Sequence, residues 1–203
     1  MSFGSLGYSK LDYARTIVAS LAWLMNRQGD AVGLSVFDER VRLVVPARYR
    51  PGQLRRIMVN LESKTSGKET NPEQALEHAA RRLNRRGFVV LISDLLAPAE
   101  QFEAGLKLLR GCGHDVVVFQ VLDPVELDLK ISGPRLFEDL ETRQKIYADP
   151  NQAGEAFTER MTEHNNAVQA ACEKLGAAFV RTVTNEPPEL ALSEFLHARR
   201  LRR

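Results

Sequence analysis

A run of five apolar residues, 88–92, constrains the fold most, because no polar residue interrupts it. A strand with one covered face alternates apolar and polar residues, whereas a parallel strand covered by helices on both faces is apolar throughout. The run ends at Ser93 and Asp94. Ligands of open α/β sheets bind outside the carboxyl ends of the strands, so Asp94 is a candidate functional carboxylate. Alternatively, Asp94 caps the next helix, since Pro98 follows closely and acidic residues favour helix starts.

Strand and helix patterns alternate along the chain. Apolar residues at three- and four-residue steps predict helices over residues 10–28, 51–63, 72–85, 98–110, 151–175 and from 187 to the carboxyl end. Apolar runs predict strands over residues 31–37, 40–46, 88–92, 115–122 and 178–183. This order predicts the α/β class, with a three-layer, doubly wound and mostly parallel sheet.

Two segments depart from the parallel pattern. The short turn at Asp38 and Glu39 predicts an antiparallel hairpin. The pieces of residues 126–149 indicate a small antiparallel excursion. We find no convincing domain boundary and expect one domain over residues 1–203.

Net charge, apolar stretches and cysteine spacing limit the functions that the chain can have. A net charge of +2 is too small to imply nucleic acid, and we interpret the arginines of residues 81–86 and the basic end 197–203 as solvated helix surface. No apolar stretch is long enough to cross a bilayer, and no signal peptide is visible. Cys112 and Cys172 form no metal-binding spacing and fit small buried side chains, which is compatible with a reducing cytoplasm.

The candidate chemistry rests on oxygen ligands. Thr70 lies in a polar loop before a helix, and Asp94 ends the strand after that helix, so both can reach one rim of the sheet. Hydroxyl and carboxylate oxygens suit Mg²⁺, although two ligands do not make a site. The alternative is a magnesium-dependent hydrolase or phosphotransfer enzyme that uses Asp94 and Asp123, but no general base is evident.

Five stretches resemble those of one family, in the same order and over essentially the whole chain: SKLDYARTIVASLAWLMNRQGDAVGLSVFDERVR, KETN, RRGFVVLISDLL, GHDVVVFQVLDPVEL and FEDLET. They are similar to the domain of unknown function fifty-eight family. Its members resemble von Willebrand factor A domains and are often encoded beside MoxR-type AAA+ ATPases. The resemblance implies a metal-ion-dependent adhesion site, in which Thr70 and Asp94 match the threonine and the late aspartate.

The D-x-S-x-S motif of that adhesion site has no match in the chain. The first residues, MSFGS, fit the sequence that follows the motif, which implies a chain that starts just after it and lacks the first central strand. The strands on either side of the gap then pair directly, accept another chain, or gain the missing strand in a longer protein, which is the outcome we expect. An exposed apolar sheet edge also invites self-association.

These considerations predict a non-enzymatic protein–protein interaction domain. The resemblance implies a role in assembling or activating a complex with a MoxR-type ATPase as partner. We expect no nucleic-acid partner, a cytoplasmic location, and little or no Mg²⁺ binding by these 203 residues. In a longer form, Mg²⁺ would complete the adhesion site and bridge to a carboxylate of the partner.

Overall fold

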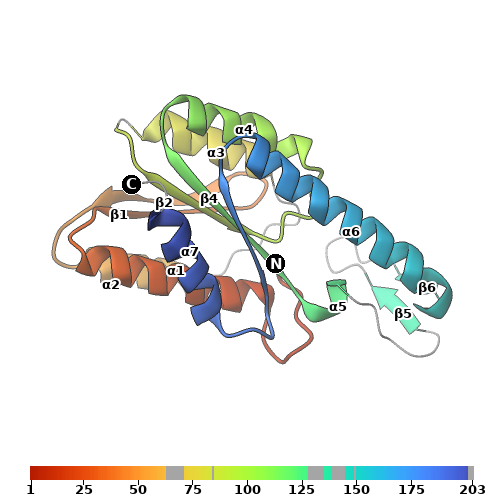
Figure 1. The fold of residues 1–203 in the computed structure, drawn as a ribbon. Coiled ribbons are helices and arrows are strands. Elements are labelled where there is room, and N and C mark those ends of the chain that lie inside the picture. Colours follow the sequence, from red (N-terminus) through yellow and green to blue (C-terminus); the bar gives the residue numbers. More distant parts are fainter. Residues whose placement is uncertain (63–70, 84, 128–134, 139–144, 149, 201–203) are drawn as a thin grey trace.

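The computed structural model describes residues 1–62, 71–83, 85–127, 135–138, 145–148 and 150–200 (Figure 1). Its helices are α1 (Lys10–Arg27), α2 (Gln53–Leu61), α3 (Pro72–Arg82), α4 (Glu100–Gly111), α5 (Pro124–Leu127), α6 (Pro150–Lys174) and α7 (Pro188–Arg200). Its strands are β1 (Val32–Phe37), β2 (Val41–Arg48), β3 (Phe88–Ser93), β4 (Asp115–Leu122), β5 (Arg135–Glu138), β6 (Lys145–Ala148) and β7 (Ala178–Val183).

The central sheet consists of three parallel strands in the order β3-β4-β7. Phe88 lies opposite Asp115 at the start of the β3–β4 ladder, and Val117 lies opposite Ala178 at the start of the β4–β7 ladder. Residues 116–122 of β4 are all buried, because β4 has a strand on each side and helices on both faces. The apolar runs therefore correctly predicted the α/β class and a parallel sheet.

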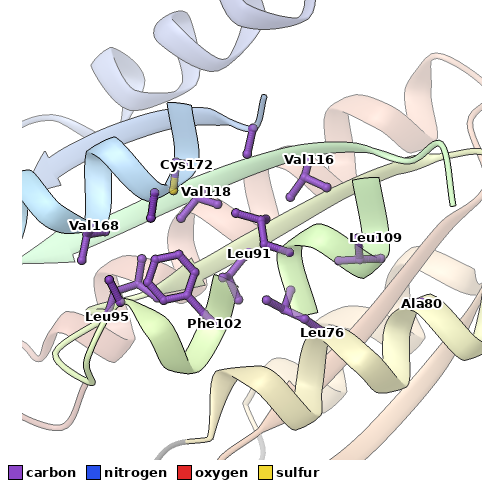
Figure 2. Close-up of a cluster of buried hydrophobic side chains, with 14 residues drawn as sticks. Leu76, Ala80, Leu91, Leu95, Phe102, Leu109, Val116, Val118, Val168 and Cys172 are labelled. Atoms are coloured by element: carbon purple, nitrogen blue, oxygen red, sulfur yellow. The ribbon is translucent and has the colours of Figure 1, made fainter. Parts of the chain in front are cut away.

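Two hydrophobic cores lie on opposite faces of this sheet. On one face, α1 and α7 pack against Val117, Phe119 and Val121 of β4. On the other face, α3, α4 and α6 pack against Val116 and Val118 (Figure 2). Successive residues of β4 thus serve alternate cores, which explains why the strand tolerates no polar residue at these five positions.

The hairpin β1–β2 forms a separate antiparallel sheet, as the short turn predicted. Within the described residues, β1 is hydrogen-bonded only to β2, and β3 only to β4. Direct pairing of β1 with β3, one of the three outcomes considered for the missing strand, is therefore not observed among the described residues. Val89, Val90 and Ile92 are only partly buried although they belong to an apolar run, because β3 has a strand neighbour on one side. The expectation of a longer protein stays a prediction, as does self-association.

The sequence misplaced some local features. Helix α4 begins at Glu100 and has no side-chain cap, so the prediction that Asp94 caps it is wrong. Cys172 is buried as expected, but Cys112 is exposed at the carboxyl end of α4.

The segment from residue 126 contains the end of the short helix α5 and the antiparallel pair β5–β6. Thr70 lies outside the described residues.

Among the described helices, none combines the length and the apolar character that crossing a bilayer requires.

We predict that Gly105→Ala destabilises the fold, because α4 and α3 approach closely there. A Cβ at residue 105 would lie 2.6 Å from the Cβ of Leu76 and 3.1 Å from the carbonyl oxygen of Glu73. Overpacking costs about 1–3 kcal/mol, which exceeds the gain of up to about 1 kcal/mol from helix propensity. Urea unfolding should show a lower free energy of unfolding. Gly111→Ala is the control, since no atom lies within 4 Å of a Cβ there; equal stability of both variants would contradict the prediction.

Candidate functional site

The carboxyl ends of the three parallel strands meet at one edge of the sheet, as they do in α/β proteins that bind ligands there. Asp94 follows β3, Asp123 follows β4 and Thr184 follows β7. All three are buried. We call this region the carboxyl edge and describe it strand by strand.

Asp94 is held by two positive charges. Its Oδ2 atom lies 3.0 Å from Nζ of Lys10 and 2.7 Å from the amino nitrogen of Met1. Lys10, the first residue of α1, also lies 2.5 Å from Oε1 of Glu126 on α5. Burial by itself raises the pKa of Asp94, but the charges and hydrogen bonds of Lys10 and of the Met1 ammonium outweigh it, so the pKa is lowered.

Asp123 accepts hydrogen bonds from three residues. The backbone N–H and the hydroxyl of Ser5 donate to it at 2.8 and 2.7 Å, the N–H of Val125 at 3.0 Å and the hydroxyl of Thr184 at 3.4 Å. Burial raises the pKa of Asp123, but these donors stabilise the ionised form and lower the pKa overall. The N–H of Asp123 in turn donates to Glu126 Oε2 at 2.8 Å, which links the two clusters.

The segment of residues 1–9 crosses the carboxyl edge and is fixed at each strand end. Its first anchor is the Met1–Asp94 contact at β3, and its second is the pair of Ser5–Asp123 hydrogen bonds at β4. At β7 the hydroxyl of Tyr8 donates to the carbonyl oxygen of Thr184 at 2.5 Å. We call residues 1–9 the edge loop.

The edge loop also satisfies the start of α1. Ser9 and Asp12 form a capping box, in which the Asp12 N–H donates to the Ser9 hydroxyl and the Ser9 N–H donates to the Asp12 carboxylate. The N–H of Lys10 donates to the carbonyl oxygen of Phe3 at 2.8 Å. Backbone donors at a helix start need such partners, so the observed conformation of the edge loop serves both the helix and the strands.

The loop after β3 is held from the other face of the sheet. His164 of α6 forms a hydrogen bond of 2.7 Å between Nε2 and the carbonyl oxygen of Leu95. Leu95 is buried and has a φ of 49°, an unusual value for a residue with a side chain. The neighbouring Leu96 is 45% exposed. The buried anchor thus turns Leu96 toward solvent at the carboxyl edge.

The described residues do not fit a magnesium site as they are arranged. Of the two expected ligands, only Asp94 is described, and its Oδ2 atom already contacts two ammonium groups. A cation that approached this oxygen would be repelled by the ammonium of Lys10, because like charges a few ångströms apart repel strongly where water is excluded. The expectation of little or no Mg²⁺ binding stays a prediction.

The alternative hypothesis was a magnesium-dependent enzyme that uses Asp94 and Asp123. The structure places both at the carboxyl edge, but each carboxylate is occupied by neighbouring donors. A general base works best with a pKa near the operating pH, whereas both of these pKa values are lowered. This arrangement suits charges that hold a structure together better than it suits proton transfer.

Sequence reasoning did not single out Lys10, Glu126, Ser5 and Thr184. Two local signals could have identified Lys10 and Glu126 as candidate residues. Lys10 begins a helix, where the dipole disfavours a cation, so it needs another partner. Glu126 follows Asp123 by three residues, the spacing of a capping box. Ser5 and Thr184 gave no such signal, since their partner is brought to them only by the fold.

One family matches most of the chain. The family described as "Protein of unknown function DUF58" matches residues 1–182. Uncharacterized protein Rv1480 of Mycobacterium tuberculosis is 24% identical over 207 residues, which cover 98% of this chain and 64% of that protein. Uncharacterized protein Mb1516 of Mycobacterium bovis gives the same figures. The chain therefore spans slightly less than two thirds of the length of these relatives.

Solved structures share the fold. An aerotolerance-related membrane protein from Bacteroides fragilis superposes with a TM-score of 0.64 at 18% identity, covering 96% of this chain and 90% of that one. BatB from Bacteroides thetaiotaomicron gives 0.57 at 18% identity, covering 94% and 88%. The pilus adhesin SpaC from Lactobacillus rhamnosus gives 0.57 at 11% identity, covering 96% of this chain and 28% of that one. At such identities the likeness concerns the fold alone.

We predict that Asp94→Asn and Asp123→Asn make the protein less sensitive to acid. Because the folded pKa of each carboxyl lies below its unfolded value, its stabilisation is complete above about pH 4 and is lost as the pH falls through the folded value. Each variant should be less stable than wild type at neutral pH and lose less stability on acidification. Urea unfolding across a pH series measures both.

Glu39→Gln is the control for these variants, because Glu39 is an exposed carboxylate in the turn of the hairpin. An acid dependence as steep in Asp94→Asn and Asp123→Asn as in wild type would contradict the stabilising role of the two carboxylates.

Proposed function

Because the chain belongs to the family of proteins of unknown function DUF58, we propose that it is a non-enzymatic interaction domain that helps to assemble or activate a protein complex. The observation that carries this proposal is the edge loop, which is rigidly anchored and carries exposed apolar side chains. The pilus adhesin of the same fold supports the proposal by analogy only.

Several large apolar side chains are exposed on the segments of the carboxyl edge. Phe3, Leu6 and Tyr8 of the edge loop are 37%, 43% and 43% exposed, and Leu96 after β3 is 45% exposed. Single exposed apolar residues are ordinary, but a group of them on anchored neighbouring segments is typical of an interface. We define the docking surface as Phe3, Leu6, Tyr8 and Leu96.

The anchors of the edge loop favour tight association. A loop that is disordered before binding loses conformational freedom when it binds, and this loss weakens the complex. Here the loop is already fixed by Ser5 at Asp123 and by Tyr8 at Thr184. The docking surface is therefore in place before a partner arrives.

A MoxR-type AAA+ ATPase is the partner that we propose. The support is the resemblance of the sequence to von Willebrand factor A-like proteins that are encoded beside such ATPases. The docking surface is apolar, so its counterpart on the ATPase would be an apolar patch with a polar rim. The two structural neighbours from Bacteroides share the fold of this chain and do not bear on the partner.

We predict that Leu6→Asp weakens binding to the MoxR-type ATPase at least tenfold, because it places a charge in an apolar contact. The melting temperature should stay close to that of wild type, since Leu6 is 43% exposed. Isothermal titration calorimetry with the purified ATPase measures the affinity, and circular dichroism measures the melting temperature.

Val59→Asp is the matched control, because Val59 is an exposed apolar residue of α2 and does not belong to the docking surface. Unchanged affinity in Leu6→Asp, or an equal loss in Val59→Asp, would refute the docking surface. Lack of binding by wild type would refute the ATPase as the partner.

A further inference from the structure

Lys10 is unusual in both its burial and its position. Its side chain is 1% exposed, although lysine is almost never fully buried without a partner. It is also the first residue of α1, where the helix dipole disfavours a positive charge. Two unfavourable features at one residue require strong compensation from its neighbours.

Two carboxylates from distant segments supply that compensation. The Lys10 ammonium lies 3.0 Å from Asp94 Oδ2, after β3, and 2.5 Å from Glu126 Oε1, on α5. The other oxygen of Glu126 accepts the N–H of Asp123, so the Glu126 carboxylate is fixed at both ends. One buried cation thus joins α1, β3 and α5 at the carboxyl edge.

We infer that Lys10 is the built-in counter-ion of the carboxyl edge, and that its ammonium takes the place which the family resemblance gives to a magnesium ion. The edge is then assembled without metal. The inference goes beyond the proposed function, because it concerns what neutralises the carboxylates of the edge and involves no partner. It rests on Lys10 and not on the Met1 ammonium, because Lys10 lies inside the chain.

Geometry separates the two kinds of counter-ion. Lys10 approaches the carboxylates at the distances of charge-assisted hydrogen bonds, whereas Mg²⁺ needs oxygen atoms at about 2.0–2.1 Å in a near-octahedral arrangement. A magnesium ion bound to Oδ2 of Asp94 would have to displace the Lys10 ammonium, whose side chain has almost no exposed surface. The displaced ammonium would also lose its carboxylate partner, and an unpaired buried charge is costly.

The first experiment tests for metal directly on the 203-residue protein. After dialysis against a chelator, the melting temperature is measured with MgCl₂, with MnCl₂ and with NaCl at matched ionic strength. We expect the same melting temperature in all three solutions. A rise that is specific to the divalent ions and disappears in Asp94→Asn would overturn the inference.

The second experiment removes the ammonium. Lys10→Met keeps the length of the side chain and leaves Asp94 and Glu126 without their cation, so we expect the melting temperature to fall by about 10 °C or more. In Lys10→Met/Asp94→Asn one of the unpaired charges is gone, so the double variant should melt above Lys10→Met. Lys107→Met, at an exposed lysine of α4, should melt like wild type.

Equal melting of Lys10→Met and Lys107→Met would overturn the inference, and so would strictly additive losses in the double variant. If Lys10→Met does not fold, a folded double variant supports the inference and an unfolded one overturns it. These measurements involve no partner protein, so their failure is distinguishable from a failure of the proposed function.

Discussion

The structure depends on the complete pairing of one strand. β4 is hydrogen-bonded to β3 on one side and to β7 on the other, and its apolar side chains enter the cores on both faces. A backbone that is wholly withdrawn from water must find all its partners within the protein. The helices α4 and α6 connect the three strands, so that all three run parallel. This arrangement also brings three strand ends, separated along the chain, to one edge of the sheet.

Ionic contacts and hydrogen bonds, rather than apolar packing, hold the carboxyl edge together. Asp94 and Asp123 are ionised groups taken out of water, which is favourable only when donors surround them. The first obtains ammonium groups and the second obtains hydroxyl and amide donors. Because most of these donors come from the edge loop and the start of α1, the same contacts that neutralise the carboxylates also fix the loop. The exposed apolar side chains of the loop are thus held by buried polar contacts.

The sequence predicted what depends on neighbouring residues and missed what depends on distant ones. Apolar runs identified β3 and β4, and helical periodicity placed α1 and α6 to within a residue or two at each end. The position of Asp94 after β3 correctly placed it at the carboxyl edge. The contacts that hold this edge could not be predicted, since Lys10 and Glu126 are 116 residues apart and Ser5 and Asp123 are 118 apart. No periodicity reports such pairs, and Thr70 stays untested because it lies outside the described residues.

The hydrogen bond between Tyr8 and Thr184 joins residues that are 176 positions apart. Closing so long a loop is entropically costly, so contacts of this kind form after the local ones. The edge loop precedes all the described strands, yet one of its anchors is Thr184, which follows β7. A chain that lacks β7 would lose the anchor at Thr184 and keep only those at Asp94 and Asp123. Full anchoring of the edge loop therefore requires all three strands of the central sheet, and the docking surface that we propose depends on the same three strands.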